Sequence, residues 1–312
     1  MQLQLEILKT LLYYDIWSHP LTAEELYAFL PVNSISLAEF KEQLGRASNV
    51  GVIQHHNGYY FIRGKSHAVA ERLKRSRHAR RMWFAARLGA HMIKRFPFVR
   101  AVFVSGDLSK NVTHSKSDVD FFIITEPDRL WIARTLLILF KKVFLFNSKK
   151  FFCLNSFVTS NHLTHDERNI YAATEIATLK PLYNSRLFTA YLSANDWIRS
   201  YFPNYDVRML PFPRCNNRRS FLQKLLELPF RMFDATRLDI RLMKMMERVW
   251  ARRYPHLDET TRRRIFRCTR TESRAYVGNF QEVILALYER RLRSFGVVPT
   301  NAVAVAAGEG AQ

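Results

Sequence analysis

The chain has 312 residues, of which 48% are apolar, and it carries a formal net charge of +21. This apolar content excludes a disordered chain, because such chains combine high charge with few hydrophobic residues. The three cysteines are widely spaced, which excludes a disulfide framework, and charges interrupt the most apolar run, which predicts no membrane span.

The basic residues lie mainly in two segments. Residues 65–100 hold eleven basic residues against one acidic residue, and residues 211–312 hold twenty against ten. This surplus predicts anionic partners, and we expect residues 65–100 and 211–295 to contact RNA or another polyanion. The N-terminal residues lack the basic and apolar blocks of a signal peptide, so we expect a cytoplasmic protein.

The first elements along the chain predict a winged-helix-like unit over residues 1–65. Leucines at helical spacing predict a first helix, and capping boxes at Thr22–Glu25 and Ser36–Glu39 begin two more. Asn57-Gly58 between two β-prone runs predicts a hairpin, because both turn residues need positive φ. The charges of the third helix cancel, so a packing or interaction role competes with DNA binding for this unit.

The next segment, residues 66–210, predicts an α+β core that begins with a basic helix. This helix covers residues 66–96, because Pro97 follows it. The later elements are predicted strands at 98–104, 117–124 and 150–158, an apolar helix at 127–146, and an interrupted helical stretch at 166–202. This order of strands and helices is typical of a mixed sheet flanked by helices.

A stretch rich in proline and asparagine separates this core from the rest of the chain. Pro203, Pro211 and Pro213 indicate the linker. Apolar periodicity then predicts a basic helical region over residues 211–300, and we expect residues 301–312 to form a flexible tail.

The residues best suited to chemistry are two aspartates in the second predicted strand. Asp118 and Asp120 are two positions apart, so they point to one face of the strand while Val119 faces the core. Two carboxylates placed in this way can hold Mg²⁺ together with substrate phosphates. Upstream, Gly106 permits close approach of the backbone to a phosphate, and Lys110 is placed to neutralise phosphate charge.

With this spacing the chain resembles the nucleotidyltransferase superfamily, which has the polymerase-β-like fold, and in particular bacterial stand-alone nucleotidyltransferase-domain proteins. Val104-Ser105-Gly106 and Asp118-Val119-Asp120, followed by four apolar residues, carry the resemblance. It implies a mixed-sheet core, a nucleoside triphosphate substrate, and catalytic and metal-binding roles for the two aspartates with Mg²⁺ or Mn²⁺. The expected nucleotide-binding residues are Ser105, Gly106, Lys110 and Ser117.

Two residues depart from the family pattern. Asp107 takes the place of the serine that follows the glycine, and Asn155 in the third strand takes the place of a third carboxylate. Glu175 could supply that carboxylate only if the fold brings it near. His162 and His165 are too few to predict a zinc site.

Three functions therefore remain open. The first, favoured by the aspartate pair, is transfer of a nucleoside monophosphate from an NTP to an unknown acceptor hydroxyl. The second is a catalytically weak or inactive protein of the same fold that binds nucleic acid or acts as a regulatory module. The third is an interaction module that docks on acidic proteins or an anionic membrane, although no amphipathic segment is distinctive enough to favour the membrane.

Overall fold

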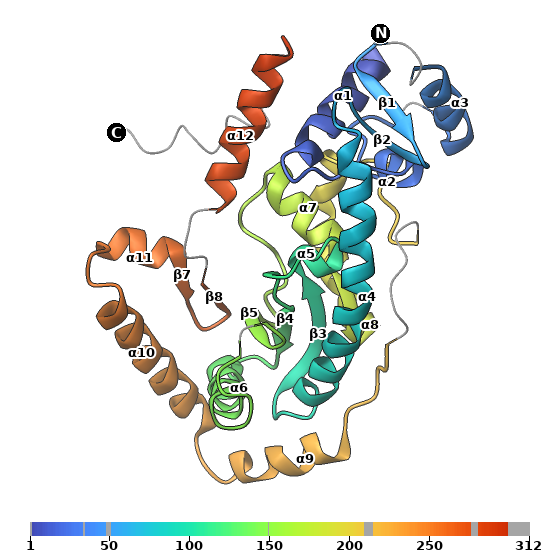
Figure 1. Cartoon of the computed structure of the whole chain (residues 1–312). Helices are drawn as coiled ribbons and strands as arrows, with labels where there is room; N and C mark the ends of the chain where they lie inside the picture. The colour runs from blue at the N-terminus through green and yellow to red at the C-terminus, as the bar shows by residue number, and fades with distance from the viewer. Residues whose placement is uncertain are drawn as a thin grey trace.

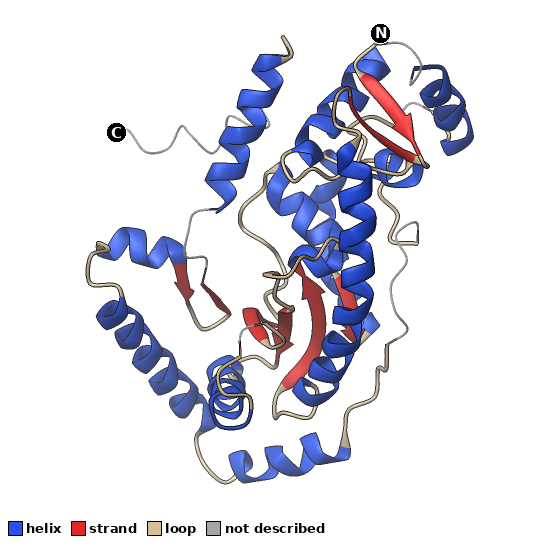
Figure 2. Ribbon diagram, in the orientation of Figure 1, coloured by secondary structure: helices blue, strands red, loops and turns tan. Residues whose placement is uncertain are grey.

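This computed structural model describes residues 2–33, 35–47, 51–148, 150–208, 215–275 and 280–298 (Figure 1). The described chain combines helices with one six-stranded sheet and one two-stranded sheet, in agreement with the predicted α+β class (Figure 2). No helix in these ranges is both long and apolar enough to cross a membrane. The predicted tail, residues 301–312, lies outside the described residues.

The N-terminal part contains the three helices and the hairpin that the sequence predicts. They are α1 (Gln2–Asp15), α2 (Ala23–Ala28), α3 (Leu37–Ala47), β1 (Ile53–His56) and β2 (Tyr59–Ile62). The Thr22 hydroxyl accepts a hydrogen bond from the Glu25 N–H at 3.2 Å, and the Glu25 carboxylate accepts one from the Thr22 N–H at 3.0 Å. Asn57 and Gly58 adopt positive φ in the hairpin turn. These local signals agree with one another, which made this part predictable.

The large sheet has six strands in the order β6-β3-β4-β5-β8-β7. Their bounds are β3 (Val99–Ser105), β4 (Asp120–Thr125), β5 (Cys153–Thr159), β6 (Lys180–Tyr183), β7 (Phe266–Cys268) and β8 (Glu272–Ala275). β4 and β5 are parallel, whereas the remaining neighbours are antiparallel. The sheet is therefore mixed, as predicted.

Alternate residues of the central strands enter different hydrophobic cores, so helices cover both faces of the sheet. On β3, Ala101 and Phe103 join a core formed with α7 (Ile170–Thr178), α8 (Ser185–Ala194), α12 (Phe280–Ser294) and the N-terminal part. Val102 and Val104 join a second core, formed with α4 (His67–Ile93), α6 (Leu130–Phe144) and α10 (Ala235–Arg253). Burial on both faces explains why these strands are continuous apolar runs.

The remaining elements are short and connect these layers. They are α5 (Gly106–Ser109), η1 (Asp196–Ser200), α9 (Phe221–Glu227), η2 (Leu228–Arg231) and α11 (Glu259–Ile265). The start of α6 is capped by a residue of another helix. The Ile132 N–H in the first turn of α6 donates to the Asp239 carboxylate of α10 at 2.8 Å. The N-cap residue of α6, Arg129, provides no such bond.

Three strands were missed by the sequence analysis. β6 lies in the stretch predicted as interrupted helix and contains Pro181, which is accommodated because β6 is an edge strand. β7 and β8 form a hairpin within residues 211–300, which were predicted to be helical, and β8 pairs with β5. β4 also begins later than predicted, at Asp120, because the Ser117 N–H closes a turn onto the His114 carbonyl at 3.1 Å.

Candidate functional site

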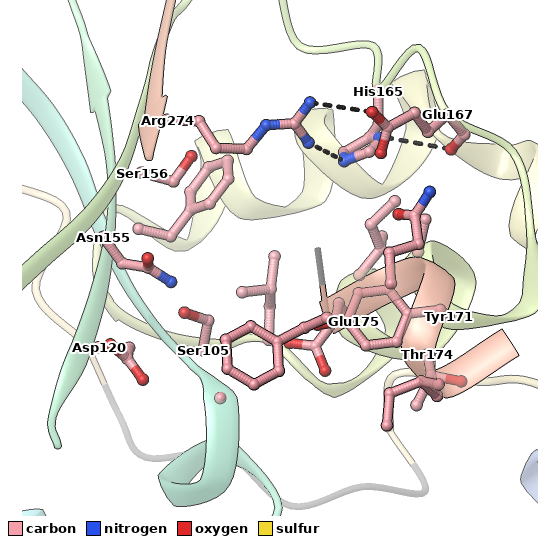
Figure 3. A pocket seen from close by; sticks show the side chains of 18 of the residues that line it. Ser105, Asp120, Asn155, Ser156, His165, Glu167, Tyr171, Thr174, Glu175 and Arg274 are labelled. Atoms are coloured by element: carbon pink, nitrogen blue, oxygen red, sulfur yellow. Dashed lines mark hydrogen bonds and ion pairs between the residues drawn. The ribbon is translucent and has the colours of Figure 1, made fainter. Parts of the chain in front are cut away.

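A cavity of about 1490 Å³ opens on the sheet face that is covered by α7. Its walls include the ends of β3, β4 and β5, helix α7, the segment 162–169, and residues of α1, β8 and α12. The side chains of Asp120, Ser105 and Asn155 lie on one side of the cavity and Glu175 lies across from them (Figure 3). Most of the residues predicted to form a site therefore line one cavity.

The two aspartates lie where the chain enters β4. Asp120 is the first residue of this strand, and Val119 before it is fully buried. The Val119 N–H donates to the Lys150 carbonyl at 2.9 Å, and its own carbonyl accepts from the Cys153 N–H at 3.0 Å. Asp118 and Asp120 both line the cavity. The spacing of the two aspartates thus has the consequence expected of an extended chain.

Gly106 is in direct contact with Asp120. Its φ is +65°, and a Cβ at this position would lie 2.6 Å from Oδ2 of Asp120. Any side chain here would therefore both strain the backbone and displace the carboxylate. The sequence analysis assigned the glycine to phosphate approach, whereas the structure adds a second reason for glycine, which is to make room for Asp120.

Several carboxylates of the cavity act on the pKa of Asp120. Burial raises the pKa of Asp120 to about 6 despite a hydrogen bond from Cys153, and the charges of Asp118, Asp107 and Glu175 add to the increase. Among the described residues, no Lys, Arg or His forms an ion pair with Asp118 or Asp120, although Lys110 pairs with Glu175 and the His114 ring lies near Asp107. The aspartate pair is thus a concentration of negative charge without a protein counter-ion in the described chain.

Lys110 joins two sides of the cavity. Its ammonium group donates to the Glu175 carboxylate at 2.7 Å and to the Gly106 carbonyl at 3.3 Å. Two polar atoms nearby are buried without a hydrogen-bond partner among the described residues, Ser105 Oγ and His19 Nδ1. Both residues line the cavity, and a buried polar atom without a partner often marks the place where a bound molecule or water completes its hydrogen bonding.

Ser117 and Asp107 are engaged with each other. The Ser117 hydroxyl donates to Asp107 Oδ2 at 2.6 Å and accepts from the His114 N–H at 3.0 Å. The His114 ring lies 3.6 Å from the same Asp107 oxygen. These contacts stabilise the loop that precedes Asp118. Asp107, which takes the place of the family serine, lines the cavity while its carboxylate binds this loop.

Asn155 owes its position to an irregularity in β5. Leu154 pairs with Phe121 and Ser156 pairs with Phe122, so Asn155 has no partner on β4. A bulge of this kind re-aims a side chain. Asn155 lines the cavity beside Asp120 (Figure 3).

The far wall of the cavity is a network of charges that the sequence analysis did not identify. The Arg274 guanidinium donates to His165 Nε2 at 3.0 Å and contacts Glu167 at 3.4 Å (Figure 3). It also contacts Glu272 at 3.2 Å. His165 Nδ1 lies 3.1 Å from the Glu167 carbonyl, so both ring nitrogens are occupied. Burial and the charge of Arg274 lower the pKa of His165. The sequence analysis named only His165, because residues 165–167 and residues 272–274 are far apart in the sequence and no local pattern joins them.

The aspartate pair fits a divalent cation. Carboxylate and amide oxygens are hard ligands, and Asp118, Asp120 and Asn155 supply them without a competing protein cation among the described residues. In the described chain, no group of three His, Cys, Asp or Glu side chains is placed to hold a metal ion. A cation held here would accordingly take its further ligands from substrate and water.

Comparisons with protein-family models, with curated proteins and with solved structures find no match to this chain.

Proposed function

We propose that the chain is a Mg²⁺-dependent nucleotidyltransferase that moves a nucleoside monophosphate from an NTP to an acceptor hydroxyl. The proposal includes a nucleotidyltransferase-type core and a winged-helix arrangement of the N-terminal helices and hairpin. The observation that carries it is the pair Asp118 and Asp120 at the start of β4. Neither aspartate has a counter-ion among the described residues, and Asp120 lies against Gly106, which has no side chain. Mg²⁺ or Mn²⁺ bound there would neutralise the phosphates and polarise the reacting phosphorus.

The other residues of the cavity have roles that follow from their contacts. Asp118 and Asp120 hold the cation. The unpartnered Ser105 hydroxyl and His19 imidazole are placed to bond substrate oxygens. Lys110 contributes positive charge beside the glycine turn while it fixes Glu175. Asn155 contributes an oxygen ligand but cannot accept the proton of the acceptor hydroxyl, because a carboxamide is not basic at neutral pH.

The acceptor in this proposal is RNA or another polyanion, bound along α4. The outward face of α4 carries five exposed basic side chains that no described acid pairs with. They are Lys74, Arg77, Arg80, Arg81 and Arg87. Phe84 is exposed among them, with 73% of its surface accessible, and is available for stacking on a base. The opposite side of α4 reaches the cavity through Arg75.

The test is transfer of label. Wild-type protein is incubated with each α-labelled NTP, Mg²⁺ and total cellular RNA or protein, beside the double variant Asp118→Ala/Asp120→Ala. Asp166→Ala is the matched control, because it also removes a carboxylate from the cavity lining but far from β4. We expect label transfer by the wild type and the control and none by the double variant. Equal labelling by all three proteins would refute the proposal.

A second candidate is a nucleic-acid-binding or regulatory protein of the same fold with weak or no catalysis. The observation that favours it is Asn155, which lies where a third carboxylate is expected. This candidate predicts salt-dependent RNA binding that is the same in the wild type and the Asp118→Ala/Asp120→Ala variant. It is rejected if NTP and Mg²⁺ together change the affinity for RNA in the wild type alone.

A further inference from the structure

Helix α9 buries polar side chains and exposes apolar ones, which is the reverse of an ordinary surface helix. Its two buried side chains are polar, Gln223 with no accessible surface and Glu227 with 7%. Its apolar side chains are exposed together with those of η2 and the two residues after it. These seven residues, which we call the α9 face, are Phe221, Leu222, Leu225, Leu226, Leu228, Met232 and Phe233.

Specific hydrogen bonds fix this orientation. Gln223 Nε2 donates to the carbonyls of Phe96 at 3.0 Å and Val99 at 2.5 Å. The Glu227 carboxylate accepts from the Phe98 N–H at 2.8 Å and from Arg100 at 2.9 Å. These bonds satisfy backbone groups at the start of β3. Because the polar side chains are bound to the protein, α9 cannot rotate to bury its leucines without leaving those groups unpaired.

The exposure of the α9 face is large for side chains of this kind. Phe221 is 80% exposed and Met232 is 88% exposed. Isolated apolar residues are common on protein surfaces, but seven large ones within thirteen residues form a patch, and patches mark contact surfaces. The face lies at the end of the molecule opposite the N-terminal part (Figure 1).

A second exposed apolar segment lies at the end of α6, a helix that shares the contact residue Phe96 with α9. The last turns of α6 expose Leu139, Val143 and Phe144, and Phe146, two residues after the helix ends, is also exposed. The two segments share one anchor, because the Phe96 carbonyl binds Gln223 while the Phe96 ring lies 5.3 Å from the ring of Phe140 on α6. The Phe140 ring in turn lies 5.1 Å from Phe144.

The charges around these apolar residues are mainly positive, and the exposed Asp234 that follows Phe233 is paired with Arg237. Arg218 and Lys224 are exposed beside the α9 face, and the one acid between residues 218 and 233 is the buried Glu227. Near the end of α6, Lys142 and Lys150 are exposed, and the sequence has no acid between Asp128 and Asp166. A second copy of the chain would bring the same positive charges against this face, which disfavours a symmetric dimer.

We propose that the α9 face inserts into the interface of an anionic lipid bilayer, with the neighbouring lysines and arginines on the headgroups. Exposed Phe, Leu and Met side chains beside exposed cations are the chemistry that interfacial helices present to such a surface. The binding is peripheral, in accordance with the absence of a spanning helix from the described residues. It is independent of the proposed transfer reaction, because none of the seven residues lines the cavity.

The test is flotation with vesicles of equimolar phosphatidylglycerol and phosphatidylcholine, in the absence of NTP and Mg²⁺. We expect wild-type protein to float with these vesicles and less with phosphatidylcholine alone. The variant Phe221→Ser/Leu225→Ser/Met232→Ser should reduce the partition coefficient about tenfold or more. The matched control is Met245→Ser/Val249→Ser/Val283→Ser, which changes three apolar side chains that are also exposed but lie on α10 and α12. It should bind as the wild type does.

The charge is tested in the same assay. Lys224→Glu should weaken flotation, whereas Lys244→Glu on the exposed side of α10 should change it less. The proposal is overturned if wild-type protein does not float, if the two triple variants lose binding equally, or if the α9 triple variant binds as the wild type does. It is also overturned if ultracentrifugation finds a wild-type dimer that the α9 variant dissociates, because the face is then a protein interface.

Discussion

Lys110 and Glu175 form an ion pair across the cavity, with the ammonium nitrogen 2.7 Å from the carboxylate oxygen. The pair joins α5, which follows β3 directly, to α7, which covers the same face of the sheet. Lys110 thereby places a positive charge beside Glu175, one of the carboxylates whose charge acts on Asp120.

The first prediction concerns this pair. Lys110→Ala and Glu175→Ala should each destabilise the protein, and the coupling energy between them in a double-mutant cycle should be about 1 kcal/mol, because both side chains are partly shielded from solvent. Urea unfolding of the four proteins measures it. Additive effects would mean that the two side chains do not interact in solution.

The second prediction concerns Gly106. Gly106→Ala should lose stability through positive φ and also through the contact with Asp120, where the added Cβ would lie 2.6 Å from the carboxylate. Gly58→Ala is the matched control, because Gly58 has φ +79° and no atom within 4 Å of an added Cβ. We expect a cost of about 1 kcal/mol for Gly58→Ala and about 1–2 kcal/mol more for Gly106→Ala. Thermal unfolding measures both, and equal costs would show that Asp120 is not held against the glycine.

The third prediction concerns pH. Burial raises the pKa of Asp239 to about 6, while its carboxylate caps α6 through the Ile132 N–H at 2.8 Å. The folded state therefore binds this proton more tightly than the unfolded state does. The contribution of the group to stability is fully present below about pH 4 and is lost as pH rises to about 6, by at most about 3 kcal/mol.

Asp239→Asn isolates this contribution, because the amide oxygen can still accept the Ile132 N–H but does not titrate in this range. The free energy of unfolding of the wild type, measured relative to that of the variant, should fall between pH 4 and pH 6. A difference that is constant over this range would contradict the prediction.

The fourth prediction concerns the third oxygen ligand. Asn155→Asp places a carboxylate beside Asp120, and a third carboxylate strengthens the binding of a divalent cation. Calorimetric titration with Mn²⁺ should give a higher affinity for the variant than for the wild type, and transfer of labelled NMP should rise with it. The Asn155→Ala control should bind Mn²⁺ no more tightly than the wild type. An unchanged Mn²⁺ affinity in Asn155→Asp would place Asn155 outside the cation site.

The fifth prediction concerns the basic face of α4. Replacing Arg77, Arg80, Arg81 and Arg87 by Gln should reduce the slope of log K for RNA against log salt by up to about 3, at about 0.7 for each phosphate that the variant no longer neutralises. The matched control replaces four arginines that already pair with acids, Arg199, Arg208, Arg237 and Arg263. We expect a smaller change for the control set, and equal changes would mean that RNA does not prefer α4.

Much of the fold was predictable because local signals pointed the same way. The apolar runs of β3 and β4 and the caps of α2 and α3 each agree with the final structure. β7 and β8 were not predicted because they are short and contain Arg267 and Arg274. Their pairing also depends on contact with β5, which is distant in the sequence. In such segments, pairing with a neighbouring strand rather than intrinsic β-propensity decides whether a strand forms.

The site was predictable only where its residues are close in sequence. Asp118, Asp120 and Gly106 follow from spacing, whereas the arrangement of Glu175, Arg274 and His165 depends on how α7 and β8 pack against the sheet. The orientation of α9 could not be predicted from the sequence, for a different reason. Its apolar residues gave a normal helical period, and nothing local indicated that Gln223 and Glu227 would bind backbone groups of β3.

The pairing of β5 with β8 has a consequence for the order in which the protein can fold. During synthesis β5 emerges long before β8, and until then one edge of the central sheet has no partner. Contact between α1 and α12 through Tyr13 and Tyr288 likewise joins the two ends of the described chain. The nascent chain therefore exposes an unfinished sheet on the ribosome, a state prone to mispairing, and we expect ribosome-associated chaperones to bind it until β8 arrives.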